Sequence, residues 1–268
     1  MLVNSAEMLC FIAHGPIIEA HSFYCYKVAI SLNGPFACTL QTDSFRQMSG
    51  FILNSNVSQA LQAPDTNVLM CYININSRLG QAIRARLATQ AYIDLSDQIT
   101  TDAFQQLLTK KPNTLRMTKL PAFIDEIMLA LLPGLPDQPQ PKLDSRVLQI
   151  TAYVDHHISH AITLADVADL VNLSVVRTRH IFFKDLGIPF SQYVLWTRTK
   201  LVITAILRKE ADLGQAAHQF GFADQSHFNR VFKRMFGTTP TAFLKTISFP
   251  DQTPEPPKPP GLPPSLQR

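Results

Sequence analysis

The chain has 268 residues, of which 46% are hydrophobic and 16% are charged, so it has the composition of a globular protein and not of a disordered one. Its length suits two modest domains, since a single domain usually holds ~100 to 200 residues. No apolar run reaches the ~18 to 20 residues of a membrane span, and no basic region precedes the first apolar stretch. We therefore expect a cytoplasmic protein without membrane contact.

The net charge of +4 gathers in one part of the chain. Residues 143–245 carry twelve Lys or Arg against eight Asp or Glu, whereas residues 1–142 carry ten of each sign. A basic region beside a neutral one is the pattern expected of a nucleic-acid-binding domain joined to a separate sensing or assembly domain.

Residues 8–75 contain short runs rich in Phe, Tyr, Val, Ile and Cys, separated by turn residues. Stretches such as 22–32 and 68–75 are typical of strands, and Asn33-Gly34 predicts a hairpin. This spacing predicts a small sandwich or barrel over residues 1–82. The cysteines form no CxxC pair, which argues against a zinc module and a disulfide framework, so we interpret all four as buried reduced thiols: Cys10, Cys25, Cys38 and Cys71.

The apolar spacing becomes helical after residue 81, with one run over 93–108 and another over 123–131. Pro121 suits the first turn of the second helix. We expect residues 83–132 to form a helical pair. That pair either closes the β domain or packs against the same pair of a second chain, which would make a homodimer.

Two proline-rich segments follow. Residues 133–142 contain four prolines and predict an extended, semi-rigid linker that marks a domain boundary. Residues 248–268 have almost no side chains to bury and predict a disordered or polyproline-like tail.

A helical pattern occurs twice between residues 164 and 243. Positions at separations of 49 or 50 pair as Leu164/Leu213, Ala168/Ala217, Val171/Phe220, Thr178/Phe228, Phe182/Phe232, Gly187/Gly237 and Tyr193/Phe243. Each copy has a small residue in a first helix, a short break, and a second helix that ends at a glycine, which predicts two helix-turn-helix units. Gly221 can adopt a positive φ in its turn, and Ser174 and Asp224 suit the N-caps of the second helices.

The second helix of each copy leaves basic and amide side chains toward solvent. Amide and guanidinium groups suit the major groove, where guanine offers two acceptors and adenine an acceptor and a donor. Lysines and further arginines suit phosphate contacts, which position a protein without reading sequence. A single exposed arginine is usually only solvated, so the prediction depends on the pairing of the two copies.

Residues 221–244, GFADQSHFNRVFKRMFGTTPTAFL, closely resemble the second helix-turn-helix signature of the AraC/XylS family of bacterial transcription regulators. Residues 164–194 resemble the first. The resemblance implies an all-α domain over residues 143–247, in which a long helix near residues 191–208 joins the two units. Both recognition helices would then enter successive major-groove segments about 34 Å apart.

By position, the resemblance implies base contacts from Val176, Arg179, His180, Gln225, Ser226 and Arg230. It implies phosphate or flanking contacts from Arg177, Lys184, Asn229, Lys233 and Arg234. The chain departs from the family pattern in both units, since Thr178 replaces a buried leucine, Phe183 a lysine and Ala216 a large aliphatic residue. In the linker helix, Val202 and Ala205 stand where the family tends to have alanine and leucine, an exchange that could conserve volume.

The N-terminal β pattern resembles the cupin-like sensor domain that often precedes this DNA-binding unit. A cupin metal site needs a cluster of histidines and a carboxylate, whereas this segment offers only His14 and His21, with Gln59 where a histidine would stand. We therefore expect no metal, cofactor or catalytic residue. An effector pocket could be lined by His21, Tyr24, Tyr26 and Cys71, although inward-facing residues of this kind are more often core.

These observations predict an α+β multidomain protein that regulates transcription. It would bind double-stranded promoter DNA, respond to a small effector or to dimerisation, and contact RNA polymerase if it is an activator. Two alternatives stay open: a metal-dependent cupin enzyme fused to a DNA module, and a nonspecific architectural DNA binder. The first lacks the histidine cluster, and salt and sequence dependence of binding would separate the second.

Overall fold

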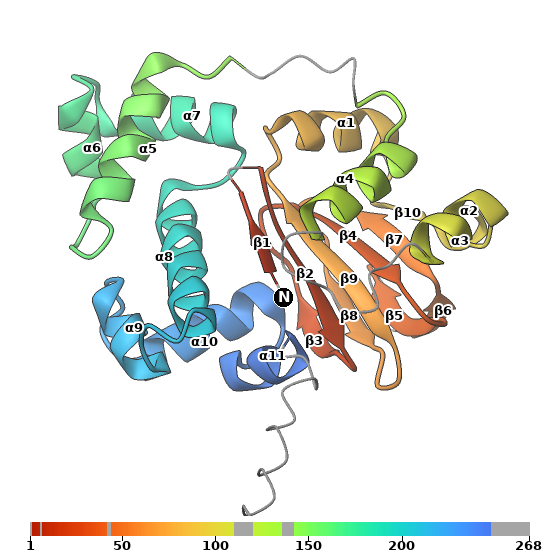
Figure 1. Cartoon of the computed structure of the whole chain (residues 1–268). Coiled ribbons are helices and arrows are strands. Elements are labelled where there is room, and N and C mark those ends of the chain that lie inside the picture. The colour runs from red at the N-terminus through yellow and green to blue at the C-terminus, as the bar shows by residue number, and fades with distance from the viewer. Residues whose placement is uncertain (1, 6, 42–43, 110–119, 136–141, 248–268) are drawn as a thin grey trace, which may run out of the picture.

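The computed structural model describes residues 2–5, 7–41, 44–109, 120–135 and 142–247. Strands with a few helices form its first half, and helices form its second (Figure 1). This arrangement confirms the predicted α+β architecture of a small sandwich followed by an all-α region. Most of the predicted linker and all of the predicted tail, residues 248–268, lie outside the described residues.

Within the described residues, the sandwich consists of two antiparallel sheets. The larger sheet has the order β1 (Leu2–Asn4), β2 (Met8–His14), β9 (Asn67–Ile73), β4 (Tyr26–Ser31), β7 (Gly50–Leu53) and β10 (Tyr92–Asp94). The smaller sheet has the order β3 (Ile17–His21), β8 (Gln59–Gln62), β5 (Phe36–Leu40) and β6 (Arg46–Met48). The central strands β4 and β9 are buried on both faces, which is why their sequences are nearly continuous apolar runs.

The predicted hairpin at Asn33-Gly34 is wrong. β4 pairs with β9 and β7, while β5 pairs with β8 and β6, so this turn carries the chain from one sheet to the other. Gly34 does adopt a positive φ of 124°, and Asn33 Oδ1 accepts a hydrogen bond from the Asn67 backbone N–H at 2.6 Å. The turn chemistry is local, whereas the pairing partners depend on how both sheets bury their faces.

Helices cover the outer face of the larger sheet (Figure 1). They are α1 (Arg78–Leu87), α2 (Ser96–Ile99), α3 (Asp102–Thr109) and α4 (Leu120–Leu131). Pro121 lies in the first turn of α4, as predicted. The prediction that residue 93 lies in a helix is wrong, because Ile93 lies in β10 and pairs with Ile52 of β7 at the edge of the sheet.

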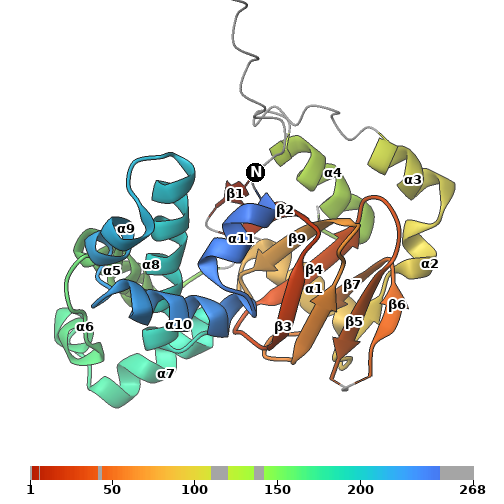
Figure 2. The same cartoon turned by 90° about the horizontal axis from the view of Figure 1, so that it is seen from below.

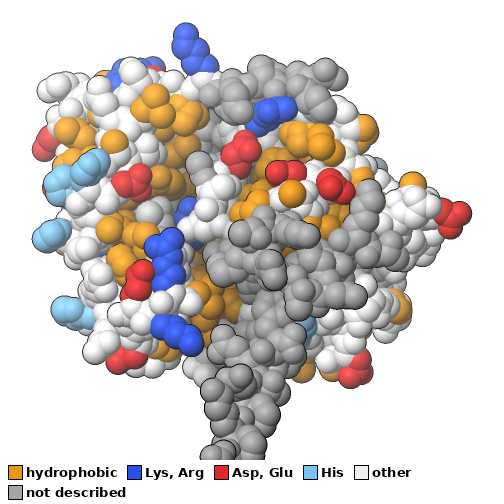
Figure 3. Space-filling model, in the orientation of Figure 1, with side chains coloured by type: hydrophobic (Ala, Val, Ile, Leu, Met, Phe, Trp, Pro, Cys, Tyr) orange, Lys and Arg blue, Asp and Glu red, His pale blue; other side chains and the backbone are white. Residues whose placement is uncertain are grey.

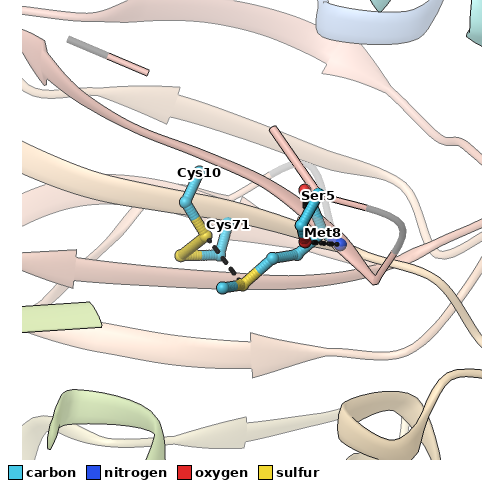
Figure 4. Close-up of a disulfide and its surroundings, with 4 residues drawn as sticks. All are labelled: Ser5, Met8, Cys10 and Cys71. Carbon is cyan, nitrogen blue, oxygen red and sulfur yellow. Dashed lines mark hydrogen bonds between the residues drawn. A yellow bond between two sulfur atoms is a disulfide. The ribbon is translucent and has the colours of Figure 1, made fainter. Parts of the chain in front are cut away.

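The structure also corrects the prediction of four reduced cysteines. Cys10 of β2 and Cys71 of β9 are directly opposite each other and form a disulfide, with Cα atoms 4.2 Å apart (Figure 4). Met8 Sδ lies 3.4 Å from Cys10 Sγ. Cys25 and Cys38 are buried free thiols, as predicted. Strand register brings Cys10 and Cys71 together from positions 61 apart in the sequence, so spacing could not indicate the pair.

The second half of the molecule contains α5 (Ser145–His157), α6 (Leu164–Leu170), α7 (Val175–Leu186), α8 (Phe190–Leu207), α9 (Leu213–Gln219), α10 (Gln225–Phe236) and α11 (Pro240–Ile247). The duplicated pattern therefore forms α6 with α7 and α9 with α10, and the predicted long connecting helix is α8. Buried residues of the sandwich interior and of these helices belong to one continuous apolar cluster.

Aromatic rings join the two halves. The Phe236 ring lies 5.1 Å from the Tyr72 ring of β9, and the Phe243 ring lies 4.8 Å from the Phe11 ring of β2, measured between centroids. Figure 2 shows α10 and α11 beside β2 and β3. The second helix-turn-helix unit is thus packed directly against the sandwich.

Candidate nucleic-acid interface

The first helix-turn-helix unit is defined by caps at both of its helices. Thr163 and Asp166 form a reciprocal capping box at the start of α6, and Ser174 accepts a hydrogen bond from the Arg177 backbone N–H at the start of α7. Each contact satisfies a backbone donor that the first helical turn leaves unpaired. α7 ends at Gly187, which has a left-handed φ of 67°.

The second unit has the same capping contacts and the same terminal glycine. Asp212 and Gln215 form the capping box of α9, and Asp224 accepts a hydrogen bond from the His227 backbone N–H at the start of α10. Gly221 in the turn has a φ of 80°, as predicted, and Gly237 ends α10 with a φ of 67°. The two turns therefore differ in length but place equivalent second helices.

Each of α7 and α10 buries one face, formed by apolar residues and Thr178. These residues are Thr178, Ile181, Phe182 and Leu186 in α7 and Phe228, Val231, Phe232, Met235 and Phe236 in α10. Thr178 is fully buried in place of the larger residue that the resemblance implies, and its Oγ1 donates to the Ser174 carbonyl at 3.0 Å. The hydroxyl therefore has a partner on its own helix.

The opposite faces carry the predicted DNA contacts. The exposed residues are Val176, Arg177, Arg179, His180 and Lys184 on α7 and Gln225, Ser226, Arg230, Lys233 and Arg234 on α10. Asn229 differs, because it is half-buried and its Oδ1 is enclosed without a hydrogen-bond partner among the described residues. In Figure 1, α7 and α10 lie at opposite ends of α8, and in Figure 2 both lie on the same side of it.

Arg198 of α8 is a positioning residue that the sequence analysis missed. It is buried, and its guanidinium donates to the carbonyls of Ile158, His160 and Gly221 at 3.0, 2.5 and 2.8 Å. These carbonyls belong to the segment before the first unit and to the turn of the second unit. Arg198 thus fixes one unit relative to the other, and an arginine in the middle of a helix that connects the two units is the signal that could have indicated it.

The predicted effector residues do not form one group. Tyr26 and Cys71 belong to the cluster on the outer face of the larger sheet, and Cys71 is bound in the disulfide. His21 is buried on the edge strand β3, and Tyr24 lines a cleft between the sandwich and α8. Alternation of side chains along strands separates residues that are close in sequence.

A buried polar cluster lies inside the sandwich instead. Lys27 is only 2% exposed, and its Nζ donates to His21 Nε2 at 2.9 Å. Burial, together with the charge of Lys27, lowers the pKa of His21 to about 3, and burial lowers the pKa of Lys27 to about 8. Gln59 is fully buried nearby in β8, and neither amide atom has a hydrogen-bond partner among the described residues.

The cleft between the two halves has a volume of about 420 Å³. Aromatic side chains line it from both sides, including Tyr24, Tyr72, Tyr193 and Trp196, together with Asp155 and Lys200. Lys200 Nζ lies 5.9 Å from the centre of the Trp196 ring, and burial lowers the pKa of this lysine. Hydrophobic side chains are visible along the seam between the helices and the sandwich in Figure 3. The cleft thus combines aromatic walls with charged side chains, among them the partly desolvated Lys200 and the Asp155 carboxylate.

The described residues contain no group of three or more His, Cys, Asp or Glu side chains that could hold a metal ion. Among the described helices, none has the combination of length and hydropathy that a membrane span requires.

Comparison with known proteins places the helical half in a family. Residues 167–246 match the model of a helix-turn-helix domain. The probable transcriptional regulator LumQ of Photobacterium leiognathi is 31% identical over 94 residues, which cover 35% of this chain and 38% of LumQ. The arabinose operon regulatory protein of Escherichia coli K12 is 28% identical over 152 residues, which cover 53% of this chain and 50% of that protein. The chain thus spans about half the length, or less, of these relatives.

Solved structures resemble the whole chain. Apo ToxT of Vibrio cholerae, as a point variant, superposes with a TM-score of 0.58 at 14% identity, over 91% of this chain and 99% of that one. Wild-type ToxT with a bound unsaturated fatty acid gives a TM-score of 0.53 at 15% identity, over 92% and 98%. At this identity the likeness establishes the fold. Together with the matched residues of the helical half, it identifies the C-terminal part of this chain as an AraC/XylS helix-turn-helix domain behind a β sandwich.

Proposed function

We propose that the chain is a sequence-specific transcription regulator that binds promoter DNA through α7 and α10. The observation that carries this proposal is the pair of capped helices that expose basic and amide side chains from one scaffold, fixed by Arg198. Val176, Arg179, His180, Gln225, Ser226 and Arg230 would face base edges, and the remaining basic residues would contact phosphates. A promoter-binding role places the protein in the cytoplasm.

The test is selection of duplexes from a random pool by the purified chain, followed by titration of the enriched duplex and a scrambled one. A regulator should prefer its site by ~10³-fold or more. Equal affinity for both duplexes, with a steep salt dependence, would instead favour a nonspecific architectural binder. A matched pair of variants sharpens the result. Arg230→Ala should weaken binding to the enriched duplex, whereas Arg46→Ala, which removes the same positive charge from the far edge of the sandwich, should leave binding unchanged.

The cleft beside α8 supports an effector site as part of this proposal. Its aromatic walls suit an apolar body, and the half-buried Lys200 suits an anionic group. A molecule of this chemistry is the fatty acid found in the ToxT structure. Tyr24 is the one member of the predicted effector set that lines this cleft within the described part of the chain.

The single tryptophan of the chain, Trp196, lies in the cleft and reports on it. Titration with a long-chain unsaturated fatty acid should change Trp196 fluorescence saturably, and Lys200→Met should weaken this binding at least tenfold because a desolvated charge pair is lost. Lys209→Met, which removes an exposed lysine just after the same helix, should leave it unchanged. A Lys200→Met protein that binds as tightly as the wild type would place the effector elsewhere.

Two parts of the proposal concern partners. A second copy of the chain is the partner expected for the helical pair of residues 83–132, and sedimentation of the purified protein tests it. RNA polymerase is the partner expected if the regulator is an activator, and transcription from the selected site in vitro distinguishes activation from repression. No catalytic role is proposed.

A further inference from the structure

The free edge of β3 contacts the end of the second recognition helix. The backbone N–H of Glu19 donates to the Gly237 carbonyl at 2.7 Å, and the two carboxylate oxygens of Glu19 lie 2.9 and 3.0 Å from Lys233 Nζ. β3 is the outermost strand of its sheet, so its unpaired backbone groups are available to the helix. The contact therefore engages a lysine that belongs to the proposed phosphate-binding set.

The same strand leads into the buried polar cluster. His21 Nδ1 donates to the Glu19 carbonyl at 2.9 Å, while His21 Nε2 accepts from Lys27 Nζ at 2.9 Å. The Lys27 ammonium group can only donate hydrogen bonds, so Nε2 of His21 is the acceptor and the ring proton lies on Nδ1. One chain of hydrogen bonds thus runs from the sandwich interior to the C-terminal end of α10.

Gly237 allows this approach for two reasons. It has a left-handed φ of 67°, and a Cβ atom at this position would meet the Glu19 carbonyl, the His21 ring and the Ile18 side chain. Any other residue would therefore push α10 away from β3. The close backbone contact lets the Glu19 side chain reach Lys233.

We propose that Glu19, positioned by His21 and Lys27, acts as an intramolecular latch that withholds Lys233 from the DNA backbone. The Glu19 carboxylate neutralises the lysine and repels a phosphate that approaches the same place. Because Lys233 and Glu19 are both partly exposed, with side chains 48% and 66% accessible, the latch is weak and reversible. This inference rests on the proposed DNA-binding role of α10 and names how the sandwich regulates it.

The first experiment needs no DNA. The full chain is treated with an acetylating N-hydroxysuccinimide ester, and modification of Lys233 is measured by mass spectrometry relative to the exposed Lys209. Glu19→Gln should raise the relative rate at Lys233 by about two- to fivefold, the range of a partly exposed ion pair. Lys27→Met should raise it less, since it acts through His21. Glu126→Gln removes the same charge from an exposed position on α4 and should change nothing.

The second experiment measures binding of the selected duplex as a function of salt. Glu19→Gln should tighten binding about two- to fivefold and steepen the slope of log K against log salt by about 0.9, one phosphate contact. Both effects should vanish in a Lys233→Gln background. Unchanged acetylation of Lys233 in Glu19→Gln overturns the latch. Raised acetylation with unchanged DNA binding shows a structural contact that does not regulate, which overturns the inference as well.

The two experiments also separate this inference from the proposed function. Failure of every variant to prefer any duplex, with Lys233 acetylation raised as expected, would contradict the DNA-binding proposal while leaving the contact itself demonstrated. Sequence-specific binding with no effect of Glu19→Gln would contradict the latch alone.

Discussion

The two helix-turn-helix units share their caps and their terminal glycines but meet the sandwich differently. Gly187 ends α7 against the side chain of Ile75, whose Cβ lies 3.0 Å from where a Cβ of residue 187 would stand. Gly237 ends α10 against the backbone of Glu19 and the ring of His21. The end of α7 thus meets the apolar side chain of Ile75 and the amide of Asn76, which donates to the Lys184 carbonyl at 3.1 Å. The end of α10 meets a polar strand edge.

A single aligned position shows the consequence. Residue 183 of the first unit corresponds to residue 233 of the second, and Phe183 is 49% exposed where Lys233 pairs with Glu19. The sandwich can therefore restrain DNA binding by one helix-turn-helix unit and not by the other, although both units have nearly the same backbone. The difference lies in what each unit packs against, and single substitutions can test it.

The largest expected effect comes from truncating the core of either unit. The Phe232 ring lies 4.5 Å from that of Phe236 and 5.2 Å from that of Phe243, and both belong to the aromatic contact with the sandwich. We expect Phe232→Ala to lower the free energy of unfolding by roughly 3 to 5 kcal/mol, measured by urea denaturation. Phe182→Ala should cost a similar amount, since its ring is also fully buried.

The exposed Phe183 supplies the control for these truncations. Phe183→Ala should change stability by no more than about 0.5 kcal/mol, because its side chain is half exposed. Unchanged unfolding of Phe232→Ala would mean that this ring is not part of the core. A much smaller loss for Phe182→Ala would mean that the first unit packs more loosely than the second.

A second effect depends on pH. Folding lowers the pKa of His21 from 6.5 to about 3, so the unfolded chain binds a proton in this range more readily than the folded one. Stability from the neutral ring is complete above pH 6.5 and is lost as pH falls toward 3, by an amount on the order of 5 kcal/mol. His21→Leu should flatten the pH dependence of urea unfolding between pH 6.5 and 4 relative to the wild type. Parallel curves for the two proteins would contradict a buried, neutral His21.

A third effect compares base contacts in the two units. Arg230→Ala should weaken binding to the selected duplex by about 1 to 3 kcal/mol and relax preference at one base pair. His180→Ala, at the aligned position of the first unit, should cost less because an imidazole has fewer N–H donors than a guanidinium. Equal losses of Arg230→Ala on selected and scrambled duplexes would assign this arginine to phosphate binding.

The smallest expected effect concerns position 183 of the first unit, which is aligned with Lys233 but does not contact Glu19. Phe183→Lys should steepen the salt dependence of DNA binding by about 0.9 at once, because the end of α7 packs against Ile75 and not against Glu19. Lys233 should add a comparable increment to the slope of the salt dependence only in the Glu19→Gln variant. An unchanged slope for Phe183→Lys would show that this end of α7 lies too far from the DNA backbone.

Much of the helical half could be predicted because its signals are local. Caps and turn glycines depend on residues within a few positions of each other, so Ser174, Gly221 and Asp224 have the predicted roles. The sandwich was predicted in type but less well in detail. Its strand pairs join distant segments, which explains the wrong hairpin at Asn33-Gly34 and the unexpected disulfide of Cys10 and Cys71.

The sequence by itself determined two helix-turn-helix units, their exposed basic faces and a preceding sandwich, because helix periodicity and capping act over short distances. Only the tertiary structure decided that Lys27 is buried against His21, that Arg198 joins the two units, and that Glu19 meets Lys233 across 214 positions. The contacts of Arg198 and of Glu19 are long-range pairings of polar groups, and the contact of His21 with Lys27 joins strands of different sheets. No local pattern records which partner a buried or interfacial charge will find.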